Sequence, residues 1–133
     1  MTSKDIVRGF WDAMRSNDFK KAAHDWLSPD FICLWPQTGE VIHGPAKYAE
    51  VNDAFPGGGE WQFEEVSLLV DGDRVVTDIR ISNEPLEVAI HAITFHETGQ
   101  NLILRQTEYW PDAYPVPGWR QGLLTVDRKL AQW

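Results

Sequence analysis

Two residues in the second half of the chain, His91 and Glu108, are of the types that transfer protons. Each lies in a run of alternating residues that predicts a β-strand, so each shares a strand face with every second neighbour. Burial raises the pKa of a carboxylate, whereas a neighbouring imidazolium lowers it again. A His–Glu pair could act as a general base and its orienting partner. In the alternative, the two groups bond each other, or Gln106, and only satisfy buried polarity.

Aromatic side chains are the second chemical feature. The chain contains 7 Trp among 133 residues, a heavy load of large, rigid groups. Six rings could form an aromatic box for a planar or hydrophobic ligand: Phe10, Trp11, Trp35, Tyr48, Phe55 and Trp110. An ordinary core is the competing interpretation, because aromatic residues at helical or strand spacing usually form one.

Metal and cofactor sites find little support in the sequence. His91 and His96 are five residues apart, so a strand places them on opposite faces, and no cluster has metal-ligand spacing. The run at 57–59 is Gly-rich, but it follows a helical pattern instead of opening one, unlike a phosphate-binding loop. Cys33 is the only cysteine and fits a small inward hydrophobic position. We predict no metal and no cofactor.

Charge narrows the range of partners. The formal net charge is -8 and the pI is about 4.8, with no basic stripe in the sequence. Nucleic acid and anionic membrane surfaces are therefore not expected partners. A single cysteine and the lack of a signal-like or long apolar segment favour a cytoplasmic protein.

The first half of the chain predicts three helices and a short hairpin. Apolar residues recur at helical spacing from Ile6 to Met14, with Thr2 and Asp5 as a capping box. Asp18 can cap a second helix, which Ser28-Pro29 ends. Short strands follow at 31–35 and 40–43. A third helix opens at Gly44-Pro45 and ends in the run 56–59.

The second half predicts a four-stranded antiparallel meander at about 60–70, 74–82, 86–95 and 100–110, with turns at 71–73, 83–85 and 97–99. Helices at one end cover only part of one sheet face. We expect an exposed apolar patch on the other face, formed by Val76, Val88, Ile90 and Tyr109. Back-to-back homodimerisation through this outer face would cover it.

Several local motifs, in this order, resemble the nuclear-transport-factor-2-like superfamily, and within it the small SnoaL-like (polyketide-cyclase-like) proteins. They span residues from about 5 to 112 and are Phe10-Trp11-Asp12-Ala13, Asn17-Asp18-Phe19, Ser28-Pro29-Asp30-Phe31, Ile42-His43-Gly44-Pro45, Thr94-Phe95-His96-Glu97-Thr98-Gly99 and Thr107-Glu108-Tyr109-Trp110. The resemblance implies an α+β cystatin-like cone, in which three helices from the N-terminal half pack on a curved, mainly antiparallel sheet of about six strands. Residues 1–133 would form one domain, with a core cone at 1–112 and a C-terminal tail at 113–133.

The resemblance also implies where the site lies. In this family the faces that hold His91 and Glu108 line the cavity, which makes the two a facing pair on adjacent strands. Phe31, Cys33 and Trp35 then point inward from the first strand. The substrate-binding residues implied are Phe10, Trp11, Trp35, His43, Tyr48, Asn52, Phe55 and Trp110.

The chain departs from the catalytic set of the ketosteroid-isomerase branch. That branch uses a tyrosine on the first helix, a carboxylate base ending the first strand, and an acid on the penultimate meander strand. These positions fall on Phe10, Trp35 and His91, and none matches. His91 does keep a polar group where that branch places a hydrogen-bond donor.

Two other catalytic sets are also incomplete. Glu108 matches the last-strand acid of the limonene-epoxide-hydrolase branch, but its other two positions fall on Ile79 and Ile81. A scytalone-dehydratase-like site needs two inward histidines, for which His43 and His91 are the available pair, without the surrounding motif.

Two hypotheses therefore stand. In the first, a SnoaL-like dimer binds a small apolar or aromatic metabolite and performs isomerase-, cyclase- or hydrolase-type acid/base chemistry through Glu108 and His91. In the second, the protein is a non-catalytic ligand-binding or dimerisation module in which both groups are structural.

Overall fold

The structure, a computed structural model, describes residues 1–56 and 60–131. Its helices are α1 (Ser3–Met14), α2 (Phe19–Trp26) and α3 (Gly44–Asp53). The strands are β1 (Leu27–Trp35), β2 (Glu40–His43), β3 (Gln62–Asp71), β4 (Arg74–Asn83), β5 (Val88–Gly99) and β6 (Leu102–Tyr109). Two short 3-10 turns, η1 (Glu84–Leu86) and η2 (Gly118–Arg120), complete the elements. The Gly-rich run at 57–59 lies outside the described residues.

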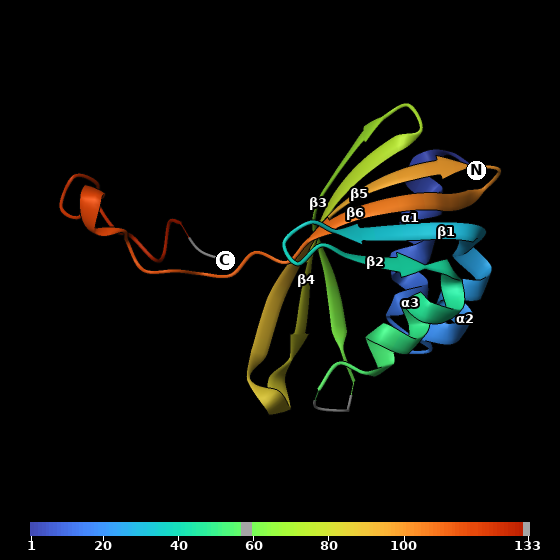
Figure 1. The fold of residues 1–133 in the computed structure, drawn as a ribbon, viewed down its shortest axis with the longest axis horizontal. Helices are drawn as coiled ribbons and strands as arrows, with labels where there is room; N and C mark the ends of the chain where they lie inside the picture. The colour runs from blue at the N-terminus through green and yellow to red at the C-terminus, as the bar shows by residue number, and fades with distance from the viewer. Residues whose placement is uncertain (57–59, 132–133) are drawn as a thin grey trace.

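One curved sheet holds the molecule together. Its strand order is β2-β1-β6-β5-β4-β3, with β1 and β6 parallel and every other neighbouring pair antiparallel. All three helices lie on the concave side of this sheet (Figure 1). The predicted α+β cone, with three helices on a mainly antiparallel six-stranded sheet, is confirmed.

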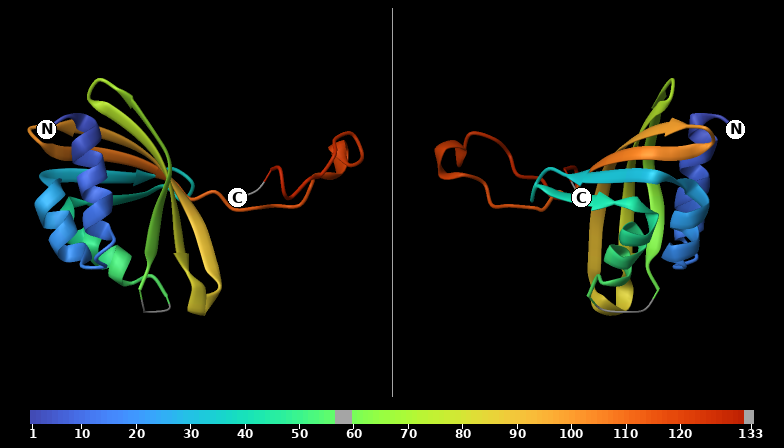
Figure 2. Two further views of the ribbon diagram at one scale, coloured as in Figure 1. Left: turned by 180° about the vertical axis from the view of Figure 1, so that it is seen from behind. Right: turned by 45° about the vertical axis from the view of Figure 1, so that its right-hand side comes forward.

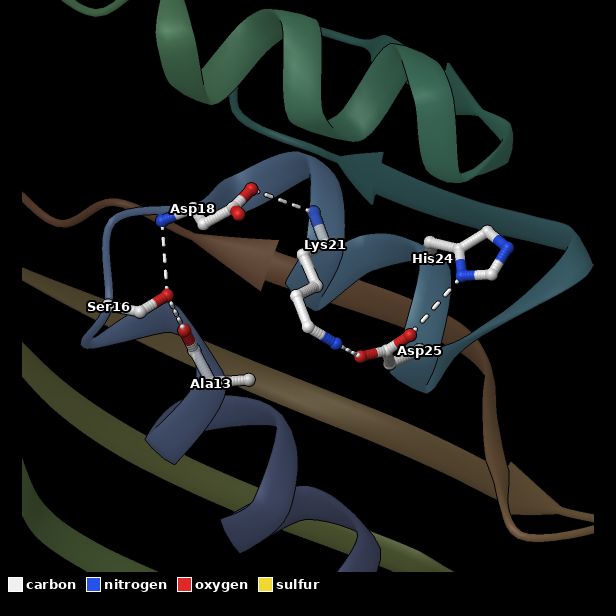
Figure 3. Close-up of polar contacts among 6 residues, drawn as sticks. All are labelled: Ala13, Ser16, Asp18, Lys21, His24 and Asp25. Carbon is white, nitrogen blue, oxygen red and sulfur yellow. Dashed lines mark hydrogen bonds and ion pairs between the residues drawn. The ribbon is translucent and has the colours of Figure 1, made fainter.

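Local capping fixes the first two helices. Thr2 and Asp5 form the predicted capping box at the start of α1, and the Asp18 carboxylate accepts from the Lys21 N–H at 3.0 Å to cap α2. Between the helices, the Ser16 hydroxyl donates to Ala13 O at 2.7 Å and accepts from the Asp18 N–H at 3.1 Å (Figure 3). These bonds set the sharp turn that brings α2 back along α1.

Close packing joins α1 to α2 and to the sheet. Ile6, Val7, Phe10, Trp11 and Met14 form the buried face of α1. Gly9 lets the two helices approach, because a Cβ there would overlap the Trp26 ring. Behind α3, Tyr48 packs edge-on against Phe31 of β1, with ring centroids 5.6 Å apart.

The largest differences from the predicted strand boundaries are at the start of β1 and at the turn between β5 and β6. β1 begins at Leu27, immediately after α2, and accommodates Pro29 through a shift in its pairing with β6 between Leu27 and Ile32. The expected turn at 97–99 is wrong, because Gly99 still pairs with Leu102. The turn lies at Gln100 and Asn101, whose φ angles of 54° and 63° close a two-residue hairpin.

Residues 113–131 form an extended arm outside the cone. The arm leaves the end of β6, runs away from the sheet on the side opposite the helices, and turns back at η2 (Figures 1 and 2). Within residues 1–56 and 60–131, no helix is long and apolar enough to cross a membrane.

Candidate functional site

A cavity of about 370 Å³ lies between the sheet, α2 and α3. Ten of its lining residues are apolar: Phe19, Trp35, Val51, Phe55, Trp61, Phe63, Ile81, Ile90, Trp110 and Pro111. Asn52, His91 and Asp112 are the polar lining residues. A hollow of this size with few polar groups is typical of a site for one small organic molecule.

Glu108 lies behind the cavity wall, on the concave face of β6, with a residue exposure of 1%. The Thr94 hydroxyl donates to its Oε2 at 2.7 Å, and the Trp35 indole N–H donates to its Oε1 at 3.2 Å. Burial raises the pKa of Glu108 to about 7, although both hydrogen bonds act to lower it. Near neutral pH the residue can therefore either hold or release a proton, and Trp35 connects it to the cavity wall.

A second buried cluster of polar side chains centres on His96, which the sequence did not single out as a site residue. Its Nδ1 lies 3.1 Å from Gln106 Nε2 and its Nε2 lies 2.9 Å from the Thr77 hydroxyl. Trp11 also bonds that hydroxyl, through its indole N–H at 3.2 Å. Burial lowers the pKa of His96 to about 3, so the ring is neutral at physiological pH.

The structure does not bring His91 and Glu108 together, which corrects the predicted facing pair. Glu108 pairs with Thr94 on the concave face, whereas His91 pairs with Arg80 on the opposite, outer face. His91 Nδ1 contacts the Asp78 carboxylate at 2.6 Å. His91 still reaches the cavity lining, because β5 has no β6 neighbour before Ile93 and its edge is open there. The prediction that His91 and His96 lie on opposite faces is confirmed.

The other predicted binding residues divide into three groups. Trp35, Asn52, Phe55 and Trp110 line the cavity. Phe10, Trp11 and Tyr48 are buried in the core and absent from the lining, because they fill the space between α1, α3 and the sheet. His43 is exposed and pairs with Ile32 on the outer face, so it too is absent from the lining.

Trp61 and Ile90 are two of the several lining positions that were not among the predicted site residues. The Asn17 side chain accepts from the Trp61 N–H at 2.7 Å and donates to the Trp61 carbonyl at 2.9 Å, which anchors the start of β3 to the α1–α2 turn. Ile90 was expected on the outer face, but it pairs with Ile81 and faces inward. Val88 also packs against the core, so the expected outer patch keeps only Val76 and Tyr109.

The core also holds Cys33, a residue type that can act as a nucleophile or a metal ligand. Phe31 and Cys33 are buried, as predicted for inward positions of β1. Burial raises the pKa of the Cys33 thiol far above its ordinary value, which keeps it protonated. Within the described part of the chain, no group of three or more His, Cys, Asp or Glu residues is placed to hold a metal ion.

The cavity has acidic residues at or near its lining positions in the sequence. Asp112 lines it, while Asp53 and Glu60 are exposed beside the lining positions Asn52 and Trp61. Glu84 and Glu87 are exposed in the turn between β4 and β5. On the α2 side, Lys20 and Lys21 follow Phe19, and Lys21 is paired with Asp25. Asp112 is thus the acidic residue of the lining itself, and the chain as a whole has a formal net charge of -8.

Comparisons with known proteins agree with this architecture. The family described as SnoaL-like domain matches residues 7–106. A structure from Kribbella flavida, described as a candidate ketosteroid isomerase, is 27% identical with a TM-score of 0.80, covering 94% of this chain and 89% of that one. An NTF-2 like protein of unknown function from Burkholderia xenovorans is 26% identical, with a TM-score of 0.72 and 94% of each chain covered.

More distant structures share the fold alone. An LEH-like epoxide hydrolase from M. tuberculosis is 19% identical, with a TM-score of 0.66 and 82% of each chain covered. Among curated proteins, none matches this chain significantly.

Proposed function

The chain belongs to the SnoaL-like family, and from that premise we propose that it binds one small, neutral or cationic, aromatic or apolar metabolite in its cavity. The observation that carries this proposal is the cavity of about 370 Å³ with its ten apolar lining residues. The Asp112 carboxylate in the lining and the net charge of -8 favour neutral and cationic molecules over anions.

One buried hydrogen-bond donor narrows the ligand class further. The indole N–H of Trp110, a lining residue, is buried and has no acceptor among the described residues. An unsatisfied buried donor costs about 1–3 kcal/mol, which a ligand acceptor would recover. The ligand we propose therefore carries a carbonyl or ether oxygen beside its apolar part.

The test uses 2-tetralone, a neutral aromatic ketone, with the anion 2-naphthoate as its charged counterpart, in isothermal titration calorimetry. We expect 2-tetralone to bind and 2-naphthoate to bind at least ~10-fold more weakly. Val51→Trp fills the cavity and should abolish binding. Val41→Trp, on the outer face of β2, is the matched control and should leave it unchanged. Equal binding by both tryptophan variants would place the ligand elsewhere and refute the proposal.

A second candidate function is acid/base catalysis on the bound metabolite, and the pKa of Glu108, about 7, favours it. One similar structure is described as a candidate ketosteroid isomerase, and others are described as SnoaL-like polyketide cyclases. Removal of a proton next to a ketone requires a base whose pKa is close to the working pH. Glu108 lies behind Trp35, one indole away from the cavity, whereas His91, bonded to Asp78, and Asp112 are titratable groups on the lining itself.

Deuterium exchange at the α-carbon of 2-tetralone in D₂O, followed by NMR, tests catalysis without knowledge of the natural substrate. If Glu108 is the base, Glu108→Gln should slow exchange by about 10²-fold, while His91→Gln should change it little. The reverse pattern would assign the base to His91. Exchange at the buffer rate with 2-tetralone bound would favour the non-catalytic binding module.

The quaternary structure we propose is a homodimer through the outer sheet face. Leu69 and Phe95 lie on this face in register with Val76. Phe95 stacks edge-on with Tyr109 at 6.2 Å, and Leu69, Phe95 and Tyr109 are exposed by 69%, 40% and 37%. Burial of this apolar band against a second copy would stabilise both. Phe95→Asp should then yield a particle near 15.2 kDa in sedimentation velocity, half the wild-type mass.

A further inference from the structure

The C-terminal arm, residues 113–131, is the most exposed apolar segment of the molecule. Six of its large hydrophobic side chains are 61–85% accessible: Tyr114, Trp119, Leu123, Leu124, Val126 and Leu130. A soluble domain rarely leaves so many large apolar groups in water, and such segments usually mark an interface. The cone supplies no cover for them, because the arm extends away from it (Figures 1 and 2).

The cone also has an apolar surface that nothing covers, on the outer face of the sheet. We call it the outer-face patch, and it consists of Leu69, Val76, Ile93, Phe95 and Tyr109. Strand pairing places these residues on one continuous face: Leu69 beside Val76, Val76 beside Phe95, and Ile93 beside Tyr109. The arm leaves the cone on this same side of the sheet, opposite the helices. Within one chain, therefore, the arm and the outer-face patch lie on the same side of the sheet, but the arm does not cover the patch.

Charge favours a second copy as the partner. Residues 113–133 carry three basic groups, Arg120, Arg128 and Lys129, and one acid, Asp127, whereas residues 1–112 carry the other nine basic and nineteen acidic groups. The arm is thus net positive and the cone strongly negative. Attraction between the arm of one chain and the cone of another offsets the repulsion between two acidic cones.

We propose that the arms are exchanged: residues 113–131 of each chain pack across the outer-face patch of a second copy and clasp the dimer. Trp119 is the anchoring side chain, because buried aromatic rings contribute strongly to interface energetics, and the Leu123–Leu124 pair adds apolar area beside it. The inference rests on the outer-face dimer proposed above and specifies its contact, because the arm of the partner, in place of the sheet of the partner, covers the patch.

The first test is carried out in the full-length chain with the triple substitution Trp119→Ser, Leu123→Ser and Leu124→Ser. Sedimentation velocity should show the wild type at twice 15.2 kDa and the variant shifted to monomer, with a dimer Kd raised at least ~100-fold. Binding of 2-tetralone should be retained, which shows that the cone is folded. A variant that dimerises as tightly as the wild type overturns the exchanged arm and leaves the sheet dimer standing. A monomeric wild type overturns both.

The second test locates the arm by cross-linking. Cys33 is buried, so newly introduced cysteines are the reactive ones. Leu123→Cys chains, mixed with differently tagged Leu69→Cys chains and oxidised, should form a disulfide-linked heterodimer. Lys20→Cys, exposed on α2, is the control and should not link to Leu123→Cys. If the double variant Leu69→Cys/Leu123→Cys links only within one chain, the arm folds back on its own cone and the proposal fails.

Discussion

Substitution of the buried carboxylate Glu108 by glutamine should change how stability depends on pH. Glu108 has an ordinary pKa of 4.5 when unfolded and about 7 when folded, because burial disfavours its ionised form. The folded state therefore binds its proton more tightly. The stability that this provides is complete below pH 4.5 and is lost as pH rises through 7. At about 1.4 kcal/mol per pKa unit, the loss amounts to roughly 3 kcal/mol.

His96 contributes with the opposite sign. Its pKa falls from 6.5 to about 3 on folding, so the unfolded state binds the proton more tightly and stability falls as pH drops from 6.5 towards 3. Between pH 4.5 and 6.5 the two effects nearly cancel. The wild type should therefore show a broad maximum there, with losses on both sides.

Glu108→Gln should remove the loss of stability that the wild type shows on the high-pH side of this maximum. Glutamine can keep both contacts, since its carbonyl can accept from Trp35 while its amide donates to the Thr94 hydroxyl. Relative to the wild type, the variant should gain roughly 3 kcal/mol between pH 5 and 8, measured by urea unfolding at each pH. Glu40→Gln, an exposed residue of β2, is the control and should give a curve parallel to the wild type. Parallel curves for Glu108→Gln would show that Glu108 does not titrate in this window and refute the reasoning.

Three further substitutions test the packing that shapes the cavity. Gly9→Ala should destabilise the protein by about 1–3 kcal/mol in urea unfolding, because its Cβ overlaps the Trp26 ring, whereas Gly118→Ala, with nothing within 4 Å, should be neutral. Asn17→Ala removes both bonds to Trp61 and places alanine at a φ of 63°, so we expect a loss of about 2–3 kcal/mol; Asn17→Gly, which relieves only the backbone strain, should recover about 1 kcal/mol of it. Asp78→Ala removes the partner of His91 Nδ1 and should lower the free energy of unfolding by about 1 kcal/mol. Its control, Asp53→Ala at the exposed end of α3, should change the free energy of unfolding by no more than ~0.5 kcal/mol.

Local signals predicted the elements of this fold well. The capping box at Thr2, the cap at Asp18 and the Gly44-Pro45 start of α3 each depend on residues close in sequence, and all three are found in the structure. Alternation along β1 showed that Phe31, Cys33 and Trp35 share one face, and the family resemblance implied that this face points inward. The end of β5 was not predictable, because Gly99 resembles a turn residue but stays paired with Leu102.

The choice between His91 and Thr94 as the neighbour of Glu108 could not be made from local sequence. The β5–β6 hairpin pairs Thr98 with Ile103 but Glu97 with Arg105, which leaves Leu104 as one extra residue in β6. Such a bulge shifts the register by one, and a shift of one exchanges the two faces of a strand. Without it, Glu108 would lie opposite Ile93 and share a face with His91.

The sequence by itself thus determined the kind of protein: the order of helices and strands, the inward aromatic residues, and a buried acid before the Tyr109-Trp110 pair. Tertiary structure decided which groups meet. It placed Glu108 with Trp35 and Thr94, left His91 with Asp78, and put Phe10 and Tyr48 in the core instead of the cavity. The physical reason is that strand faces follow from pairing between distant residues, where one bulged residue changes every contact beyond it.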